Sequence, residues 1–74
     1  SLYRVAQIYI DLSLALEEAR RAVELVVLPK GQPVELLPRS SKLRKMQHEL
    51  VEHYHLKSLS FGDEPNRRLR IYPA

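Results

Sequence analysis

The stretch that decides the fold is residues 40–53, which read SSKLRKMQHELVEH. Its apolar residues recur at helical spacing and form one stripe along a helix. The stripe comprises Leu43, Met46, Leu50, Val51 and, just beyond the stretch, Tyr54. Ser40 or Ser41 is a suitable cap, because a serine hydroxyl accepts a hydrogen bond from a free N–H group of the first turn. We therefore predict a helix over residues 42–53 that buries this stripe.

A longer helix is predicted upstream, over about residues 3–27. Apolar residues recur there at alternating steps of four and three, namely Val5, Tyr9, Leu12, Leu16, Ala19, Val23 and Val26. Strict alternation, typical of a strand, is also present at Ile8, Ile10, Leu12, Leu14 and Leu16, so a strand over residues 5–14 stays open. We favour the helix, because no turn residue separates this part from the helix-forming residues 14–24. Its first turns are expected to pack on a neighbouring domain or on a second copy.

Three short strands are predicted at residues 34–37, 56–61 and 68–72. The residues expected to face inward on the last two are Leu59, Phe61, Leu69 and Ile71. Between these strands lies GDEPN, whose residue types favour a turn and hence an antiparallel hairpin. The order helix, strand, helix, strand, strand predicts the α+β class: a small two-layer sandwich with two helices on one face of a three-stranded sheet.

Composition excludes several classes of protein. The chain has 74 residues, 45% hydrophobic and 28% charged, which is typical of one small globular domain. Without cysteine, it has no disulfide, thiolate zinc site or thiol chemistry, and we expect an intracellular protein. No glycine-rich phosphate loop is present, and His53 points away from His48 and His55 on a helix. We expect no enzyme, cofactor, metal or membrane partner.

Positive charge is concentrated in the second half of the chain. Residues 1–37 carry four basic and five acidic groups, a net charge of −1, whereas residues 38–74 carry eight and four, a net charge of +4. Seven of these eight basic residues lie near the two ends of that half: Arg39, Lys42, Arg44, Lys45, Arg67, Arg68 and Arg70. Clustered cations raise the local concentration of phosphates, so a polyanionic partner is possible.

Arg44 and His48 are one helical turn apart, at the edge of the apolar stripe. We expect both side chains to project into solvent, where a guanidinium binds phosphate in a bidentate manner and an imidazole donates or stacks. The alternative is a solvated face with ordinary ion pairs, Lys45–Glu49 and His48–Glu52.

These residues resemble the R-3-H domain, a family named for an arginine and a histidine separated by three residues. Arg44 to His48 fits its Arg-x-x-x-His signature, and residues 33–38 resemble its preceding strand and proline turn. Residues 62–68 resemble its Gly-x-Glu-Pro-x-Arg hairpin, and His55 stands where relatives often have glycine. The resemblance covers about residues 15–73. We therefore expect residues 1–74 to be a single R-3-H-like domain with a helical extension at 1–14. Because the sequence starts with Ser1 rather than methionine, we expect this domain to be excised from a longer protein.

The resemblance implies a non-catalytic module that binds single-stranded DNA or RNA with low sequence specificity, mainly through phosphates. Its site residues would be Arg44 and His48, then Arg67 and Arg68, with support from Arg39, Lys42, Lys45 and Arg70. If about five cations contact phosphates, log K falls with log salt with a slope of roughly −3.5. The resemblance is greatest to versions fused to a bacterial or plastid ring-type ATPase, which implies a location in the cytoplasm or nucleoid, or in a plastid. The alternative is a protein-interaction or oligomerisation segment of such an ATPase, self-associating through the first helix.

Two residues outside the signature, Tyr72 and Glu64, have positions that suggest a role in binding or in structure. Strand alternation places Tyr72 with Arg68 and Arg70 on the sheet face opposite Leu69 and Ile71, where it offers a stacking surface or is an edge residue without a task. Glu64 is expected to close the hairpin or to pair with Arg67 or Arg44.

Overall fold

The chain folds into a long helical rod, a shorter helix and a three-stranded sheet in the computed structural model, which describes all 74 residues. The rod consists of α1 (Leu2–Ala22), the π-helical turn η1 (Val23–Val27) and α2 (Leu28–Lys30). It ends at Gly31, whose φ of 62° is left-handed. The remaining elements are β1 (Val34–Glu35), α3 (Ser41–His53), β2 (Lys57–Phe61) and β3 (Arg68–Tyr72). The Ser40 hydroxyl caps α3 by accepting a hydrogen bond from the Leu43 N–H at 3.4 Å.

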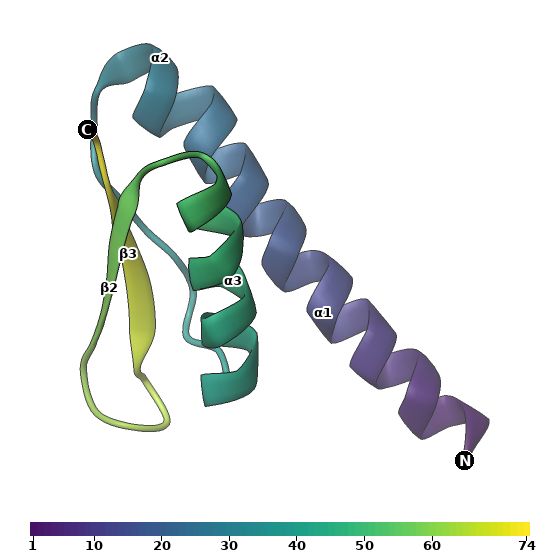
Figure 1. The fold of residues 1–74 in the computed structure, drawn as a ribbon. Helices are drawn as coiled ribbons and strands as arrows, with labels where there is room; N and C mark the ends of the chain where they lie inside the picture. The colour runs from purple at the N-terminus through teal and green to yellow at the C-terminus, as the bar shows by residue number, and fades with distance from the viewer.

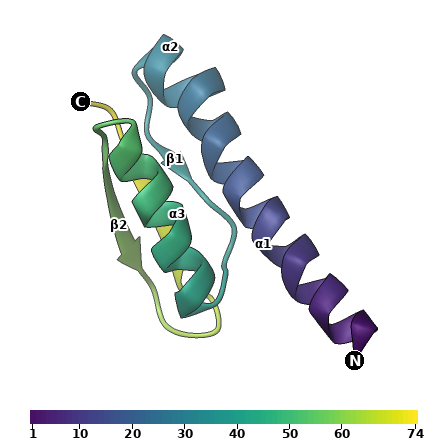
Figure 2. The same cartoon turned by 45° about the vertical axis from the view of Figure 1, so that its right-hand side comes forward.

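The sheet is antiparallel with the order β1-β3-β2. Its centre is Ile71, which lies opposite Val34 on β1 and Ser58 on β2. Helix α3 lies against the sheet, and the rod runs alongside α3 (Figure 1, Figure 2). The predicted α+β class, the order of elements and the β2–β3 hairpin are confirmed.

The core forms where the rod, α3 and the inner face of the sheet meet. It comprises Ala19, Ala22, Val23, Val27, Leu36, Val51, Leu56, Leu69 and Ile71. Small alanines on the rod allow α3 to approach it closely, while Leu69 and Ile71 face both from the central strand. The inward orientation predicted for these two β3 residues is confirmed.

The buried face of α3 differs from the predicted stripe. Its buried residues are Arg44, Gln47 and Val51, whereas Met46 is 38% exposed. Gln47 lies within this face, and its Nε2 donates to the Ala15 carbonyl at 2.9 Å and to Glu18 Oε1 at 3.3 Å. The buried face extends to Arg44, which contacts Glu64 and the Arg39 carbonyl, and the prediction that Met46 is buried is wrong.

Strand β2 faces the opposite way from the prediction. Leu59 is 63% exposed, and Ser58 is buried on the helix-facing side. The register sets this orientation, because Ser58 pairs with the buried Ile71 and Phe61 pairs with the outward-facing Arg68. Ser58 tolerates burial because its hydroxyl has a hydrogen-bond partner on α3. The predicted inward positions of Leu59 and Phe61 are therefore wrong.

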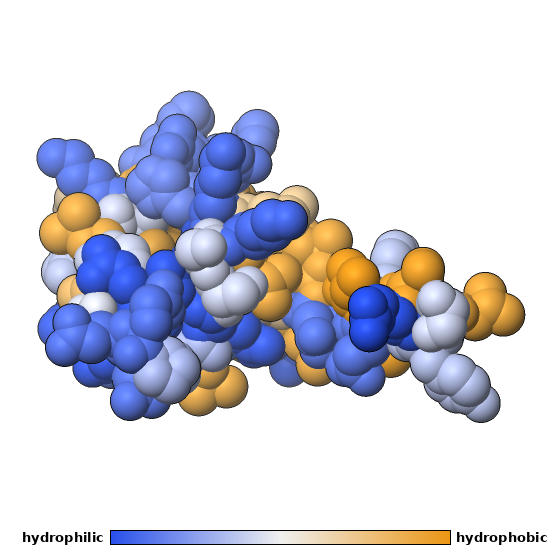
Figure 3. All heavy atoms as spheres, turned by 90° about the horizontal axis from the view of Figure 1, so that it is seen from below, coloured by the Kyte–Doolittle hydropathy of each residue, from blue (hydrophilic) through white to orange (hydrophobic).

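The first turns of α1 extend beyond the rest of the domain (Figure 1). The region is helical, so the strand interpretation of residues 5–14 is wrong. Residues 1–10 are all exposed, and Val5 and Tyr9 of the predicted stripe remain uncovered because the 13-residue α3 is too short to reach them. Figure 3 shows the apolar surface of this protruding part.

Candidate functional site

A hollow of about 400 Å³ opens between α3 and the β2–β3 hairpin. We call it the hairpin hollow; it is lined by Ser41, Arg44, Lys45, His48, Ser58, Leu59, Ser60, Arg67 and Leu69. Residues from both ends of the basic half of the chain meet here, as do the two signature residues. Four of the eight predicted site residues, Arg44, Lys45, His48 and Arg67, thus share one concave surface.

Arg44 is buried, which corrects the expectation that it projects into solvent. The residue is only 8% exposed. Its two terminal nitrogens form a bidentate ion pair with Glu64, with Nη1 to Oε1 at 3.1 Å and Nη2 to Oε2 at 2.9 Å. Nη1 also donates to the Arg39 carbonyl at 2.7 Å. Arg44 therefore joins α3 to the hairpin loop and to the segment before α3.

The Arg44 guanidinium beside Glu64 lowers the pKa of that carboxyl below its ordinary value of 4.5. The hydrogen bonds from Arg44 are the main cause; desolvation opposes them and is the next largest effect, and the charges of Arg44 and then Arg67 again lower the pKa. Glu64 is thus ionised at neutral pH and neutralises Arg44. The expected structural role of Glu64 at the hairpin is confirmed, with Arg44 as its partner.

His48 faces the hollow with both ring nitrogens engaged. Its Nδ1 lies 2.5 Å from the Ser58 hydroxyl on β2, and its Nε2 lies 2.6 Å from Glu52 Oε1 one turn along α3. The side chain is 43% exposed, and that of Glu52 is 61% exposed. Ser58 therefore fixes the ring, while the exposed Glu52 is free to swing away from the other nitrogen.

Arg67 and Lys45 supply positive charge that no carboxylate pairs with. Arg67 donates from Nη1 to the Gly62 carbonyl at 2.8 Å and from Nη2 to the Ser60 carbonyl at 3.2 Å, which holds its side chain along the hairpin. Gly62 turns at a φ of 91°, and a Cβ there would lie 2.9 Å from the Arg68 side chain. Lys45 is exposed and makes no salt bridge.

The other four predicted residues lie elsewhere. Arg39 pairs with Glu18 on α1 at 3.2 Å, and Arg68 pairs with Glu35 on β1 at 2.9 Å. Lys42 borders a different hollow, between α3 and α1. Arg70 lies on the outer face of the sheet.

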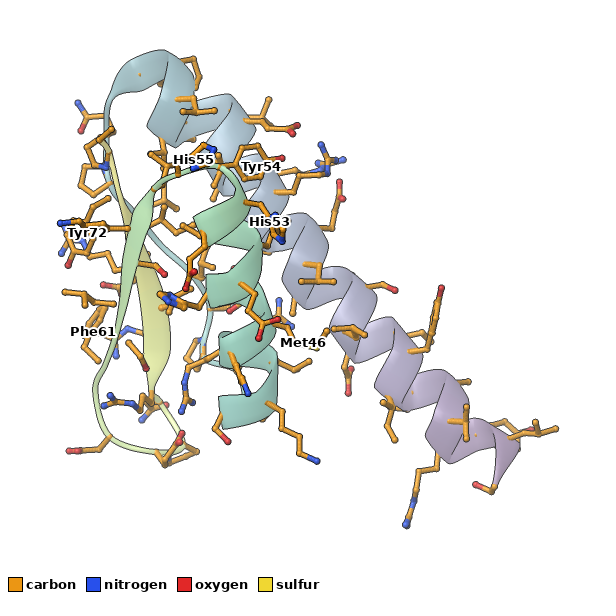
Figure 4. The ribbon with its side chains drawn as sticks, viewed as in Figure 1. Met46, His53, Tyr54, His55, Phe61 and Tyr72 are labelled. Carbon is orange, nitrogen blue, oxygen red and sulfur yellow. The ribbon has the colours of Figure 1, made fainter.

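The remaining histidines lie apart from this hollow. His53 is the last residue of α3, and His55 follows it with a left-handed φ of 59°. Figure 4 shows both at the far end of α3. No three histidine, aspartate or glutamate side chains converge in a way that could hold a metal ion.

Sequence reasoning missed Ser58 and Ser60, which line the hairpin hollow, and the buried Gln47 of α3. The two serines alternate on β2 and pair with Ile71 and Leu69, so serines opposite buried β3 residues were the available signal. For Gln47 the available signal was its place on the helix between Leu43 and Val51, inside the apolar stripe.

The chain belongs to the R-3-H domain family, whose profile matches residues 14–73. Members of this family are generally nucleic-acid-binding modules. The hydrophobic core and the Arg44–His48 signature both lie within the matched part.

Two curated proteins are similar to this chain, each 52% identical over 59 residues. One is the protein ycf45 of Porphyra purpurea, and the other is the protein SEEDLING PLASTID DEVELOPMENT 1 of Arabidopsis thaliana. The match covers 80% of this chain but only 10% and 9% of theirs, so the chain spans about a tenth of the length of these relatives. No solved structure matches. None of the helices has the length and apolar character needed to span a membrane.

Proposed function

We propose that this chain binds single-stranded DNA or RNA without catalysis, and that a phosphate group occupies the hairpin hollow. The observation that carries the proposal is the meeting of Lys45, Arg67 and His48 in one concave surface. Lys45 and Arg67 lack a carboxylate partner, so their charge is available to an anion. Family membership supports nucleic acid as the source of that anion.

The proposal gives the signature residues different tasks. Lys45 and Arg67 contact the phosphate, and His48 donates to it after Glu52 swings away. Arg44 is a positioning residue, because its guanidinium already donates to two backbone carbonyls and to its charge partner Glu64. It holds Glu64 and the Arg67 carbonyl, so it sets the distance between α3 and the hairpin.

Pairing within the protein reduces the number of cations available to phosphates. Arg44, Arg39 and Arg68 each have a carboxylate partner, so the hollow itself offers two free cations, Lys45 and Arg67. Two phosphate contacts give a slope of log K against log salt of about −1.4, less than half the roughly −3.5 that five contacts would give. Affinity of the isolated domain is therefore modest.

A tethered neighbour would compensate for this modest affinity through effective concentration. We propose that the domain is an accessory part of a longer protein, as in the relatives of which it matches only about a tenth, with a ring-type ATPase as the suggested neighbour. By the same likeness we propose a plastid location.

Two lysines on α3 provide the test. Lys45 borders the hairpin hollow, whereas Lys42 borders the hollow toward α1; both are exposed and neither makes a salt bridge. Fluorescence anisotropy with labelled single-stranded DNA, single-stranded RNA and duplex DNA would be measured over a range of salt. At 0.1 M salt the loss of one phosphate contact lowers affinity about fivefold, so we expect this loss in Lys45→Gln and almost none in Lys42→Gln. Equal losses of affinity in both variants, or an affinity that does not change with salt concentration, would refute the assignment of a phosphate to the hairpin hollow.

The protruding part of α1 supports a second candidate function, self-association of two copies. The large apolar side chains of this part are 49–90% exposed: Leu2, Tyr3, Val5, Ile8, Tyr9, Ile10 and Leu14. One stripe among them has the alternating three- and four-residue spacing of helix pairs. In an antiparallel pair centred near Ile8, Arg4 of each copy would approach Asp11 of the other.

Sedimentation velocity at several concentrations tests this candidate. We expect a dimer that Val5→Glu dissociates, with the thermal midpoint unchanged at concentrations where the wild type is itself monomeric, because Val5 is 64% exposed. Arg4→Asp should also weaken the dimer by placing two acidic residues together, and adding Asp11→Arg should restore it. A monomer at every concentration would exclude self-association and leave nucleic-acid binding unaffected.

A further inference from the structure

The face of the sheet turned away from the helices is uncovered and carries aromatic and cationic side chains. We call it the outer sheet face; its residues are Glu35, Lys57, Leu59, Phe61, Arg68, Arg70 and Tyr72. Figure 4 shows Tyr72 and Phe61 pointing away from α3. Leu59 is 63% exposed at the centre of β2, where a soluble domain would ordinarily place a polar residue.

Two arginine–aromatic pairs lie on this face, and they differ in charge balance. The Arg68 guanidinium lies 4.3 Å from the centre of the Phe61 ring and is neutralised by Glu35. The Arg70 guanidinium lies 5.5 Å from the centre of the Tyr72 ring and has no carboxylate partner. The Phe61 ring is thus covered by an arginine whose charge is neutralised, whereas at the Tyr72 end of the face the aromatic ring lies against Arg70, a cation without a carboxylate partner.

A second hollow connects the Tyr72 end to the hairpin hollow. We call it the edge hollow; it has a volume of about 560 Å³ and is lined by His48, Glu52, Leu56, Lys57, Ser58, Leu59 and Tyr72. It shares His48, Ser58 and Leu59 with the hairpin hollow. Because β2 is an edge strand of the sheet, these shared residues lead from α3 over the edge toward Tyr72.

We propose that the Tyr72 end of the outer sheet face is a second subsite of the same interface, where a nucleobase stacks on Tyr72 against Leu59. Arg70 and Lys57 then contact the flanking phosphates. This inference rests on the proposed function, because the strand must first be held in the hairpin hollow. Stacking on an aromatic ring beside free cations is the usual way in which open sheet faces hold single strands. Every base offers a flat face, so the subsite adds affinity with little base preference.

The subsite has a measurable signature in strand length and salt. A trinucleotide would occupy the hairpin hollow alone, with two cations and a slope near −1.4. A twelve-nucleotide strand would also reach Lys57 and Arg70, which raises the contacts to four and the slope to about −2.8. In Arg70→Gln the slope for the longer strand should fall by about 0.7, and the trinucleotide should be unaffected.

Tyrosine fluorescence reports the stacking directly. The chain has four tyrosines, so replacing Tyr3, Tyr9 and Tyr54 by phenylalanine leaves Tyr72 as the only reporter. A matched variant that keeps only Tyr3, which is 90% exposed on the protruding helix, is the control. Each would be titrated with twelve-nucleotide DNA and with the same strand lacking its bases.

Tyr72→Ala tests the energetic contribution, with Tyr9→Ala as the matched surface control and thermal melting as the check on folding. We expect quenching of Tyr72 but not Tyr3, at least a fivefold loss of affinity in Tyr72→Ala, and weaker binding of the strand without bases. Binding that depends on Lys45 without Tyr72 quenching, and with equal affinity for the strand without bases, would overturn the second subsite and leave the proposed function intact. No binding of any single strand would overturn both.

Discussion

Replacing Arg44 by methionine separates a positioning residue from a phosphate contact. Methionine keeps much of the length and apolar stem of arginine and removes every donor. In the structure those donors hold Glu64, the Arg39 carbonyl and, more weakly, the Arg67 carbonyl at 3.5 Å. The substitution should therefore release the hairpin from α3 and leave a part-buried carbonyl without its partner.

The expected loss follows from the burial of Arg44. Hydrogen bonds to a charged group contribute about 1.5–3 kcal/mol to stability, and we take about 2 kcal/mol for this nearly buried guanidinium. For a domain of this size each kcal/mol moves the melting temperature by about 4–8 °C, so a decrease of about 10 °C is expected. The melting temperature of Arg44→Lys should lie between those of wild type and Arg44→Met, because lysine keeps the charge but loses the bidentate geometry.

The assay combines thermal melting by circular dichroism with binding to a single strand over a range of salt. Arg44→Met should lower the melting temperature and the affinity, with the wild-type slope of log K against log salt. Lys45→Gln should also lower the affinity, but with an unchanged melting temperature and a slope smaller by about 0.7. If Arg44→Met melts like wild type and reduces the slope, Arg44 is an exposed phosphate contact and the positioning role is wrong.

Three further predictions concern single residues. Because Arg44 lowers the pKa of Glu64, their pairing stabilises the fold fully above the ordinary pKa of 4.5, and this stabilisation is lost as the pH falls below 4.5 and through the lowered pKa. Melting temperatures of wild type and Glu64→Gln should therefore differ at pH 7 and converge in acid. His55 has a φ of 59°, which glycine adopts more easily than histidine, so His55→Gly should stabilise the domain by about 0.5–1 kcal/mol. In contrast, His53→Gly inside α3 should destabilise it by about 1 kcal/mol. If both variants are destabilised, the turn geometry at His55 is contradicted. Glu52→Gln removes a negative charge beside His48 and should strengthen single-strand binding about twofold in anisotropy titrations, and weaker binding would mean that Glu52 orients the ring productively.

The order of elements was predictable because each carries its own local signal. Ser40 as a cap, Gly31 at the end of the rod and the turn residues at 62–66 determine where elements end, and all three act within a few residues. Helical spacing likewise identified α1 and α3. The R-3-H signature then identified the family, because its parts occur in the family's order along the chain.

Which side chains are buried and which are exposed was less predictable, because this depends on partners that are distant in sequence. Burial of Gln47 depends on the hydrogen bonds that its amide donates to the Ala15 carbonyl and to Glu18, and burial of Ser58 depends on its hydrogen bond with His48. Arg44 was expected in solvent, since helix periodicity alone does not reveal that Glu64 lies within reach. The grouping of Arg44, Lys45, His48 and Arg67 was implied by the family, but their division between structure and binding required the ion pairs.

The most direct measurement is a titration of the ¹⁵N-labelled domain with a short single-stranded oligonucleotide, followed by NMR. Saturable shifts are predicted around the hairpin hollow, at Lys45, His48, Ser58 and Arg67, with residues 2–10 of the protruding helix unchanged. Shifts confined to those helical residues, or no saturable shift at Lys45 and Arg67, would contradict the claim that a phosphate occupies the hollow.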